Sequence, residues 1–241
     1  MATPGFPGFP PEAMEFFRAL KKNNKREWFQ KRKHIYEEKV LAPMVDLVTA
    51  FNRRLVRFAP EYVNEPRRAI YRIYRDTRFS KDKTPYKTHI AAVFPHQGLG
   101  KHNCGGFYFG IDPDELEVAG GLYMPGPEQL RAVRDHIAAS SKEFERLVSN
   151  KTLRGLMGSL WGDQLSRVPK GYAPEHPAAA YLRYKQWIFY TTSLPPKLAT
   201  TPELLEEIVK RAKVMTQFVE FLNRPLKKMA AKRVDLSEFL V

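Results

Sequence analysis

The sequence is poor in cysteine, since Cys104 is the only one among 241 residues. A single thiol excludes an intrachain disulfide bond and any zinc or iron–sulfur site that needs several cysteines. His96 and His102 are metal-binding residue types close to Cys104, but they lie in a glycine-containing loop without the spacing of a known metal site. We therefore expect no metal and no cofactor, and we expect Cys104 to be dispensable for folding.

Long hydrophobic runs are also missing. No segment reaches the roughly 18 consecutive apolar residues of a membrane helix. Residues 1–11 have neither the basic start nor the apolar run of a signal peptide. We therefore expect a cytoplasmic protein with no membrane partner. Neither an interdomain linker nor an internal repeat is visible, so residues 1–241 are predicted to form a single domain, whose oligomeric state the sequence leaves open.

Acidic residues are a minority. The chain has 40 Lys and Arg against 26 Asp and Glu, which gives a formal net charge of +14 and a pI near 9.8. Such an excess attracts nucleic acids and phosphorylated metabolites over long distances. A basic surface attracts polyanions at long range but does not define a binding site. It therefore predicts at most weak, sequence-independent nucleic-acid binding. In the basic segment 21–33, Trp28 and Phe29 are predicted to be buried anchors of a helix rather than a stacking platform for bases.

Hydrophobic residues make up 43% of the chain, which is enough for a core without disulfide or metal support. Apolar residues follow helical spacing near both ends, whereas aromatic and β-branched residues alternate with others in the middle. This order predicts an α+β fold, with a central antiparallel sheet of about five strands covered by helices from the N- and C-terminal thirds. The predicted strands are 69–75, 88–94, 106–111, 115–123 and 186–192. Asn24, with Glu27 three residues later, predicts the N-cap of a further helix.

Positive charge is most concentrated between residues 72 and 87, in a segment that joins two predicted strands. This segment contains six cationic side chains and only two acidic ones. Guanidinium groups bind carboxylate or phosphate oxygens in pairs, so several of them in one place favour a small anionic ligand as the partner. The predicted anion-binding residues are Arg72, Arg75, Arg78, Lys83, Tyr86 and Lys87, with Asp76 and Asp82 as the carboxylates that orient the arginines.

The same segment carries a resemblance to a known family. Its pattern is Arg72-x-x-Arg75-Asp76-x-Arg78-Phe79-x-x-Asp82-Lys83-x-Pro85-Tyr86-Lys87. Further family-like segments are Gly120-Gly121-Leu122-Tyr123-Met124-Pro125, Pro169-Lys170-Gly171-Tyr172, His176-Pro177 and Leu182-Arg183. The chain resembles domain of unknown function 2461, a family of bacterial proteins of about this length. The resemblance covers most of the chain, and it implies no activity, substrate or cofactor.

No reaction follows from these residues, and whether the protein is an enzyme stays open. A carboxylate beside guanidinium groups has a lowered pKa, which makes Asp76 and Asp82 poor general bases. Tyr86 and His89 are the alternatives for proton transfer. Three other interpretations stand beside the binding of a small anion: a structural ion-pair network, an enzyme acting on a phosphorylated substrate, and a sequence-independent nucleic-acid binder.

Overall fold

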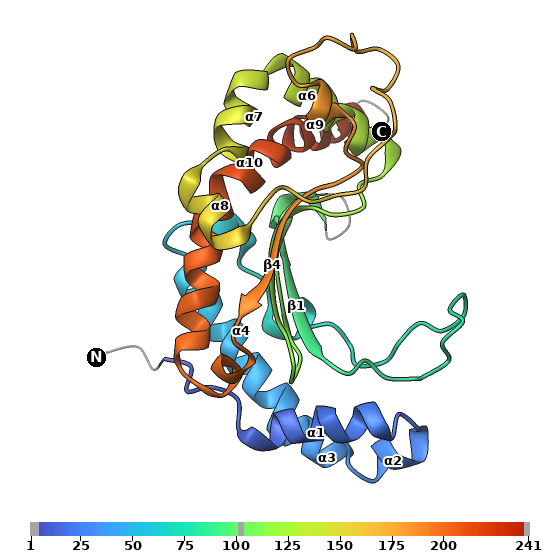
Figure 1. Ribbon diagram of the computed structural model, residues 1–241, viewed down its shortest axis with the longest axis vertical. Coiled ribbons are helices and arrows are strands. Elements are labelled where there is room, and N and C mark those ends of the chain that lie inside the picture. Colours follow the sequence, from blue (N-terminus) through green and yellow to red (C-terminus); the bar gives the residue numbers. More distant parts are fainter. Residues whose placement is uncertain (1–4, 101–103, 239–241) are drawn as a thin grey trace.

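The computed structural model describes residues 5–100 and 104–238. These residues form an α+β fold in which a four-stranded antiparallel sheet packs against helices from both ends of the chain (Figure 1). The strands are neighbours in chain order: β1 (Ile90–Pro95), β2 (Gly106–Ile111), β3 (Leu116–Leu122) and β4 (Trp187–Leu194). The predicted fold class and the antiparallel arrangement are confirmed.

The chain forms several helical segments before the sheet. They are α1 (Pro11–Lys22), α2 (Arg26–Gln30), α3 (Lys33–Ile35), the π-helical segment η1 (Tyr36–Leu41), α4 (Ala42–Leu55), the 3-10 turn η2 (Pro60–Tyr62) and α5 (Pro66–Ala69). Apolar residues on one side of α4 are buried because they repeat at helical spacing. Phe51 of α4 contacts Phe94 of β1 and Phe109 of β2 edge-on, with ring centroids 4.8 and 5.6 Å apart.

The C-terminal helix α10 (Glu203–Glu238) runs along the same face and is the longest element (Figure 1). Phe218 of α10 contacts Phe189 of β4, with ring centroids 4.9 Å apart. Met215 lies against Gly120 of β3, whose missing side chain lets the helix approach the sheet closely. The predicted cover of the sheet by helices from both thirds of the chain is therefore confirmed.

The remaining elements lie in the connections. They are η3 (Gln97–Leu99), α6 (Pro127–Ala139), α7 (Ser141–Val148), α8 (Lys151–Met157), α9 (Ala179–Leu182) and η4 (Pro196–Thr200). In the described part of the chain, no helix lies over the sheet face opposite α10 (Figure 1). Tyr108, Glu117 and Tyr190 lie on this opposite side, because their strand neighbours Phe109, Val118 and Phe189 point into the core. We call it the open face.

The predicted strand 69–75 is wrong, and the sheet has four strands rather than five. Residues 70–89 form an irregular hairpin, which we call the basic hairpin. Ile70 makes an isolated bridge with Ala92 of β1, whereas Tyr74 makes one with Tyr86 inside the hairpin. The segment divides its backbone hydrogen bonds between two partners, so no continuous ladder forms even though its side chains alternate as in a strand.

Cys104 lies in the loop before β2, but its side chain is buried in the hydrophobic core and only 9% exposed. This packing argues against the predicted dispensability of Cys104 for folding. Among residues 5–100 and 104–238, no group of three or more His, Cys, Asp or Glu side chains is placed to bind a metal ion. His102 lies outside these residues. None of the helices described is both long and apolar enough to cross a membrane.

Candidate functional site

The basic hairpin folds back on itself and extends away from the sheet on the side opposite α10 (Figure 1). Two backbone hydrogen bonds close its base. The Arg75 N–H donates to the Pro85 carbonyl at 2.9 Å, and the Lys87 N–H donates to the Ile73 carbonyl at 2.8 Å. Pro85 has no N–H to return, so the pairing stops there and residues 76–84 form an irregular tip.

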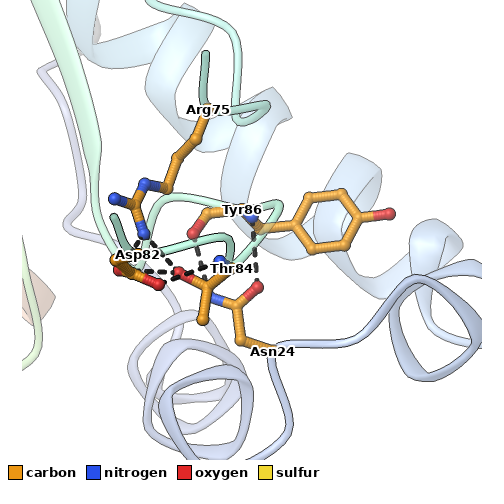
Figure 2. A network of polar contacts seen from close by, with 5 residues as sticks. All are labelled: Asn24, Arg75, Asp82, Thr84 and Tyr86. Atoms are coloured by element: carbon orange, nitrogen blue, oxygen red, sulfur yellow. Dashed lines mark hydrogen bonds and ion pairs between the residues drawn. The ribbon is translucent and has the colours of Figure 1, made fainter. Parts of the chain in front are cut away.

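Asn24 and Tyr86 attach the hairpin to the N-terminal helices. The Asn24 amide donates to the Tyr86 carbonyl at 2.9 Å and accepts from the Tyr86 N–H at 3.1 Å (Figure 2). The predicted role of Asn24 as a helix N-cap is wrong, because Lys25 occupies that position and the Asn24 amide is used by Tyr86. The Tyr86 ring is 2% exposed and is stacked on Phe29, with ring centroids 4.1 Å apart. Asn24 and Phe29 thus fix the base of the hairpin.

Arg75, Asp82 and Thr84 form the first ion-pair cluster of the hairpin (Figure 2). Arg75 pairs with the Asp82 carboxylate and donates to the Thr84 hydroxyl, while the Thr84 N–H donates to Asp82 at 2.9 Å. The hydrogen bond from Arg75, followed by those from Thr84, lowers the pKa of Asp82 to about 2. In Figure 2 the Tyr86 ring points away from this cluster, so its hydroxyl does not face Arg75.

Arg78 and Asp76 form the second cluster. The Arg78 guanidinium donates to both Asp76 oxygens, at 3.0 and 2.8 Å, and the Arg78 backbone N–H adds a third hydrogen bond at 3.2 Å. These bonds lower the pKa of Asp76 to about 2, and the nearby charge of Arg72 lowers it further. Both hairpin carboxylates are therefore ionised at neutral pH and are poor proton acceptors.

The other predicted residues complete the surface of the hairpin. The Lys83 ammonium donates to the Thr77 carbonyl at 2.9 Å, and the Lys87 ammonium lies over the Tyr71 ring, 4.9 Å from its centroid. The Arg78 side chain is 77% exposed and lies against Phe79, which is 94% exposed at the tip. The structure thus distributes the cations over the hairpin: Arg75 lies with Asp82, Arg72 and Arg78 lie near Asp76, and Lys87 lies over Tyr71.

Sequence reasoning missed a polar cluster on the open face. The Tyr108 hydroxyl of β2 donates to Glu117 of β3 at 2.7 Å, and the Tyr190 hydroxyl of β4 donates to the other oxygen of the same carboxylate at 2.9 Å. We call these three residues the Tyr–Glu–Tyr cluster. The alternation in strands 106–111 and 115–123 could have placed Tyr108 and Glu117 on one face, since a short turn joins the two strands. The contribution of Tyr190 had no signal in the sequence.

The cluster is a set of fixed hydrogen-bond donors around one acceptor. Burial raises the pKa of Tyr108, and the charge of Glu117 adds to this effect. Burial and the hydrogen bond to Glu117 likewise raise the pKa of Tyr190. Both phenols therefore stay protonated at neutral pH. Burial also lowers the pKa of His89, which keeps that imidazole neutral, and the charges of Glu117 and Lys87 influence the same group.

These features define an α+β protein with an open sheet face and a protruding basic hairpin. A family model described as a conserved hypothetical protein, DUF2461, matches residues 12–221. The chain belongs to this family, as the resemblance of the hairpin pattern predicted. No curated protein and no solved structure matches the chain.

Proposed function

We propose that the protein binds a small anionic ligand, bearing phosphate or carboxylate, through the basic hairpin. The observation that carries this proposal is that the segment 72–87 contains six cationic side chains and only two carboxylates, and that each carboxylate is paired with an arginine. Positive charges that share one hairpin repel one another, so a bound anion lowers the electrostatic free energy of the hairpin. Both ion pairs are partly exposed to solvent, so a ligand can reach them.

Within this site we assign the anion contacts to Arg72, Arg75, Arg78, Lys83 and Lys87. Asp76 and Asp82 orient the arginines through the hydrogen bonds described above. Tyr86 supports the site by fixing the base of the hairpin, since its ring is buried against Phe29. Pre-organised guanidinium groups lose little freedom when a ligand binds, which favours affinity.

The experiment is thermal unfolding of the wild type, Arg78→Ala and the control Arg53→Ala with a panel of inorganic phosphate, sugar phosphates, nucleotides and dicarboxylates. Arg53 is an exposed arginine of α4, outside the hairpin. A ligand at a hundredfold excess over its dissociation constant stabilises the fold by about 2.7 kcal/mol, which raises the melting temperature measurably. We expect Arg78→Ala to remove that rise and Arg53→Ala to keep it.

Without ligand, Arg78→Ala should melt close to the wild type, because an exposed ion pair adds little to stability. The ion-pair network interpretation makes the opposite prediction. It expects no compound to shift the wild type and Arg78→Ala alone to be clearly destabilised.

Sequence-independent nucleic-acid binding is the second candidate. It is favoured by Phe79, whose ring is 94% exposed at the tip of the cationic hairpin, since an exposed aromatic ring beside cations is suited to stacking on an unpaired base.

A further inference from the structure

The strands around the Tyr–Glu–Tyr cluster leave space for it. A Cβ atom at Gly110 would lie 2.5 Å from a Glu117 carboxylate oxygen and 2.8 Å from the Tyr108 hydroxyl oxygen. Ala119 separates the two tyrosines in the sheet register, since it pairs with Tyr108 of β2 and with Tyr190 of β4. A side chain at position 110 would displace the carboxylate, so the cluster depends on this glycine.

A bulge in β4 lies opposite Glu117. The register between β3 and β4 changes from Leu116 paired with Leu194 to Val118 paired with Thr191. The extra residue increases the local twist and changes the direction of neighbouring side chains, a device that proteins use beside binding sites. Tyr190, next to the bulge, remains 38% exposed while its hydroxyl reaches Glu117.

The oxygen atoms of the cluster can accept further hydrogen bonds, so the cluster favours a ligand that donates them. Each carboxylate oxygen of Glu117 accepts one phenol hydrogen and keeps further acceptor capacity, and each phenol oxygen can also accept. A phosphate group at this position would be repelled by the Glu117 charge. The cluster therefore complements the uncharged, hydroxyl-bearing part of a ligand or an ammonium group.

The cluster lies beside the base of the basic hairpin. Lys87 lies over the Tyr71 ring, whose centroid is 6.5 Å from that of Tyr108, and Tyr108 donates to Glu117. His89 lies close enough to both for the charges of Lys87 and Glu117 to influence it. An ammonium group at Glu117 would meet the repulsion of Lys87 and the hairpin, whereas hydroxyl groups would not. The combined surface thus favours a polyol with an anionic end.

We propose that the Tyr–Glu–Tyr cluster binds the hydroxyl groups of a sugar ring whose phosphate is bound by the basic hairpin. The ligand class is a phosphorylated sugar, either free or as part of a nucleotide. This inference rests on the proposed function of the hairpin. It adds the sugar, whose hydroxyl groups the cations of the hairpin do not recognise. The tyrosine ring faces also offer apolar surface to the carbon atoms of the sugar.

The test is isothermal titration calorimetry with four probes: inorganic phosphate, ribose 5-phosphate, a ribonucleoside 5′-monophosphate and phosphoethanolamine. The proteins are the wild type, Glu117→Gln, Tyr190→Phe and the control Glu115→Gln. Glu115 is an exposed carboxylate just before β3, and its charge influences Tyr190 without a hydrogen bond between the two side chains. Tyr190→Phe removes a single hydroxyl from a partly exposed ring, so it keeps the test valid if Glu117→Gln disturbs the sheet.

We expect the wild type to bind ribose 5-phosphate or the nucleotide more tightly than inorganic phosphate. Glu117→Gln and Tyr190→Phe should weaken this binding by about tenfold, the effect of one lost hydrogen bond to a charged group. Neither variant should change the affinity for inorganic phosphate by more than about twofold, and Glu115→Gln should behave as the wild type. A preference for the free sugar phosphate or for the nucleotide identifies which of the two sources the site accepts.

Four results would overturn the inference. If inorganic phosphate binds as tightly as both sugar phosphates, or if both variants bind the sugar phosphates as the wild type does, the cluster does not contact a sugar while the hairpin proposal stands. Tighter binding of phosphoethanolamine would replace the sugar with an amine. If none of the four probes binds, the function proposed for the hairpin fails as well.

Discussion

Single residues decide where the chain can pass close to itself. Gly121 of β3 has a φ of +139°, and a Cβ atom there would overlap the carbonyl oxygen of Trp187 in β4. Gly155 in α8 has no heavy atom within 4 Å of the place its Cβ would occupy. Replacement by alanine should therefore change the free energy of unfolding differently at the two glycines.

We predict that Gly121→Ala lowers the free energy of unfolding by more than about 2 kcal/mol, because it combines an unfavourable φ with a clash against backbone. Gly155→Ala, the matched control, should be neutral or raise it by up to about 1 kcal/mol, since alanine is the better helix former. Urea unfolding of both variants measures the difference. Equal midpoints would show that β3 and β4 can move apart at Gly121 without loss.

At the scale of elements, the basic hairpin depends on a contact from another part of the chain. Asn24 satisfies both backbone groups of Tyr86, which is 62 residues away in the sequence. Amide side chains can donate and accept at once, which no other uncharged side chain of similar size does with the same geometry. The position of the hairpin cations therefore depends on an uncharged residue outside the hairpin.

We predict that Asn24→Ala loosens the hairpin and lowers the free energy of unfolding by about 1–3 kcal/mol, because the Tyr86 backbone groups lose their partner. Amide hydrogen exchange at Tyr86 should become faster by about tenfold or more. Asn24→Asp keeps the acceptor for the Tyr86 N–H and should protect this amide better than alanine does. Unchanged exchange in Asn24→Ala would mean that the Phe29 stacking alone fixes the hairpin.

The sequence located some elements well because their signal is local. The predicted strand 106–111 has the observed bounds of β2, and 115–123 contains β3 with one residue more at each end. The segment 69–75 shows the same alternation, but its hydrogen-bond partners are set by tertiary contacts that a period of two does not reveal. The charge of the basic hairpin follows from composition. The Tyr–Glu–Tyr cluster could not be predicted from the sequence in this way. Tyr190 and Glu117 are 73 residues apart and meet only through the register of β3 with β4.

At the scale of the whole molecule, the dominant property is the net charge of +14. Such a charge attracts any polyanion, whether or not a specific site exists. We predict that single-stranded oligonucleotides bind weakly, without sequence preference, and dissociate near 0.2 M salt, because the attraction comes from counterion release. Fluorescence anisotropy with two unrelated oligonucleotides at several salt concentrations measures this. Binding that persists at 0.2 M salt with a shallow salt dependence would instead favour the nucleic-acid function over the small-anion site.

The two edges of the sheet are each paired with another part of the chain. The Tyr71 N–H donates to the Ala91 carbonyl at the edge of β1, and Trp161 exchanges two hydrogen bonds with Ile188 at the edge of β4. Exposed strand edges are templates on which other chains add strands and grow into aggregates. At these positions a second copy would first have to displace Tyr71 or Trp161. The segments that flank the open face thus also protect the protein from edge-to-edge polymerisation.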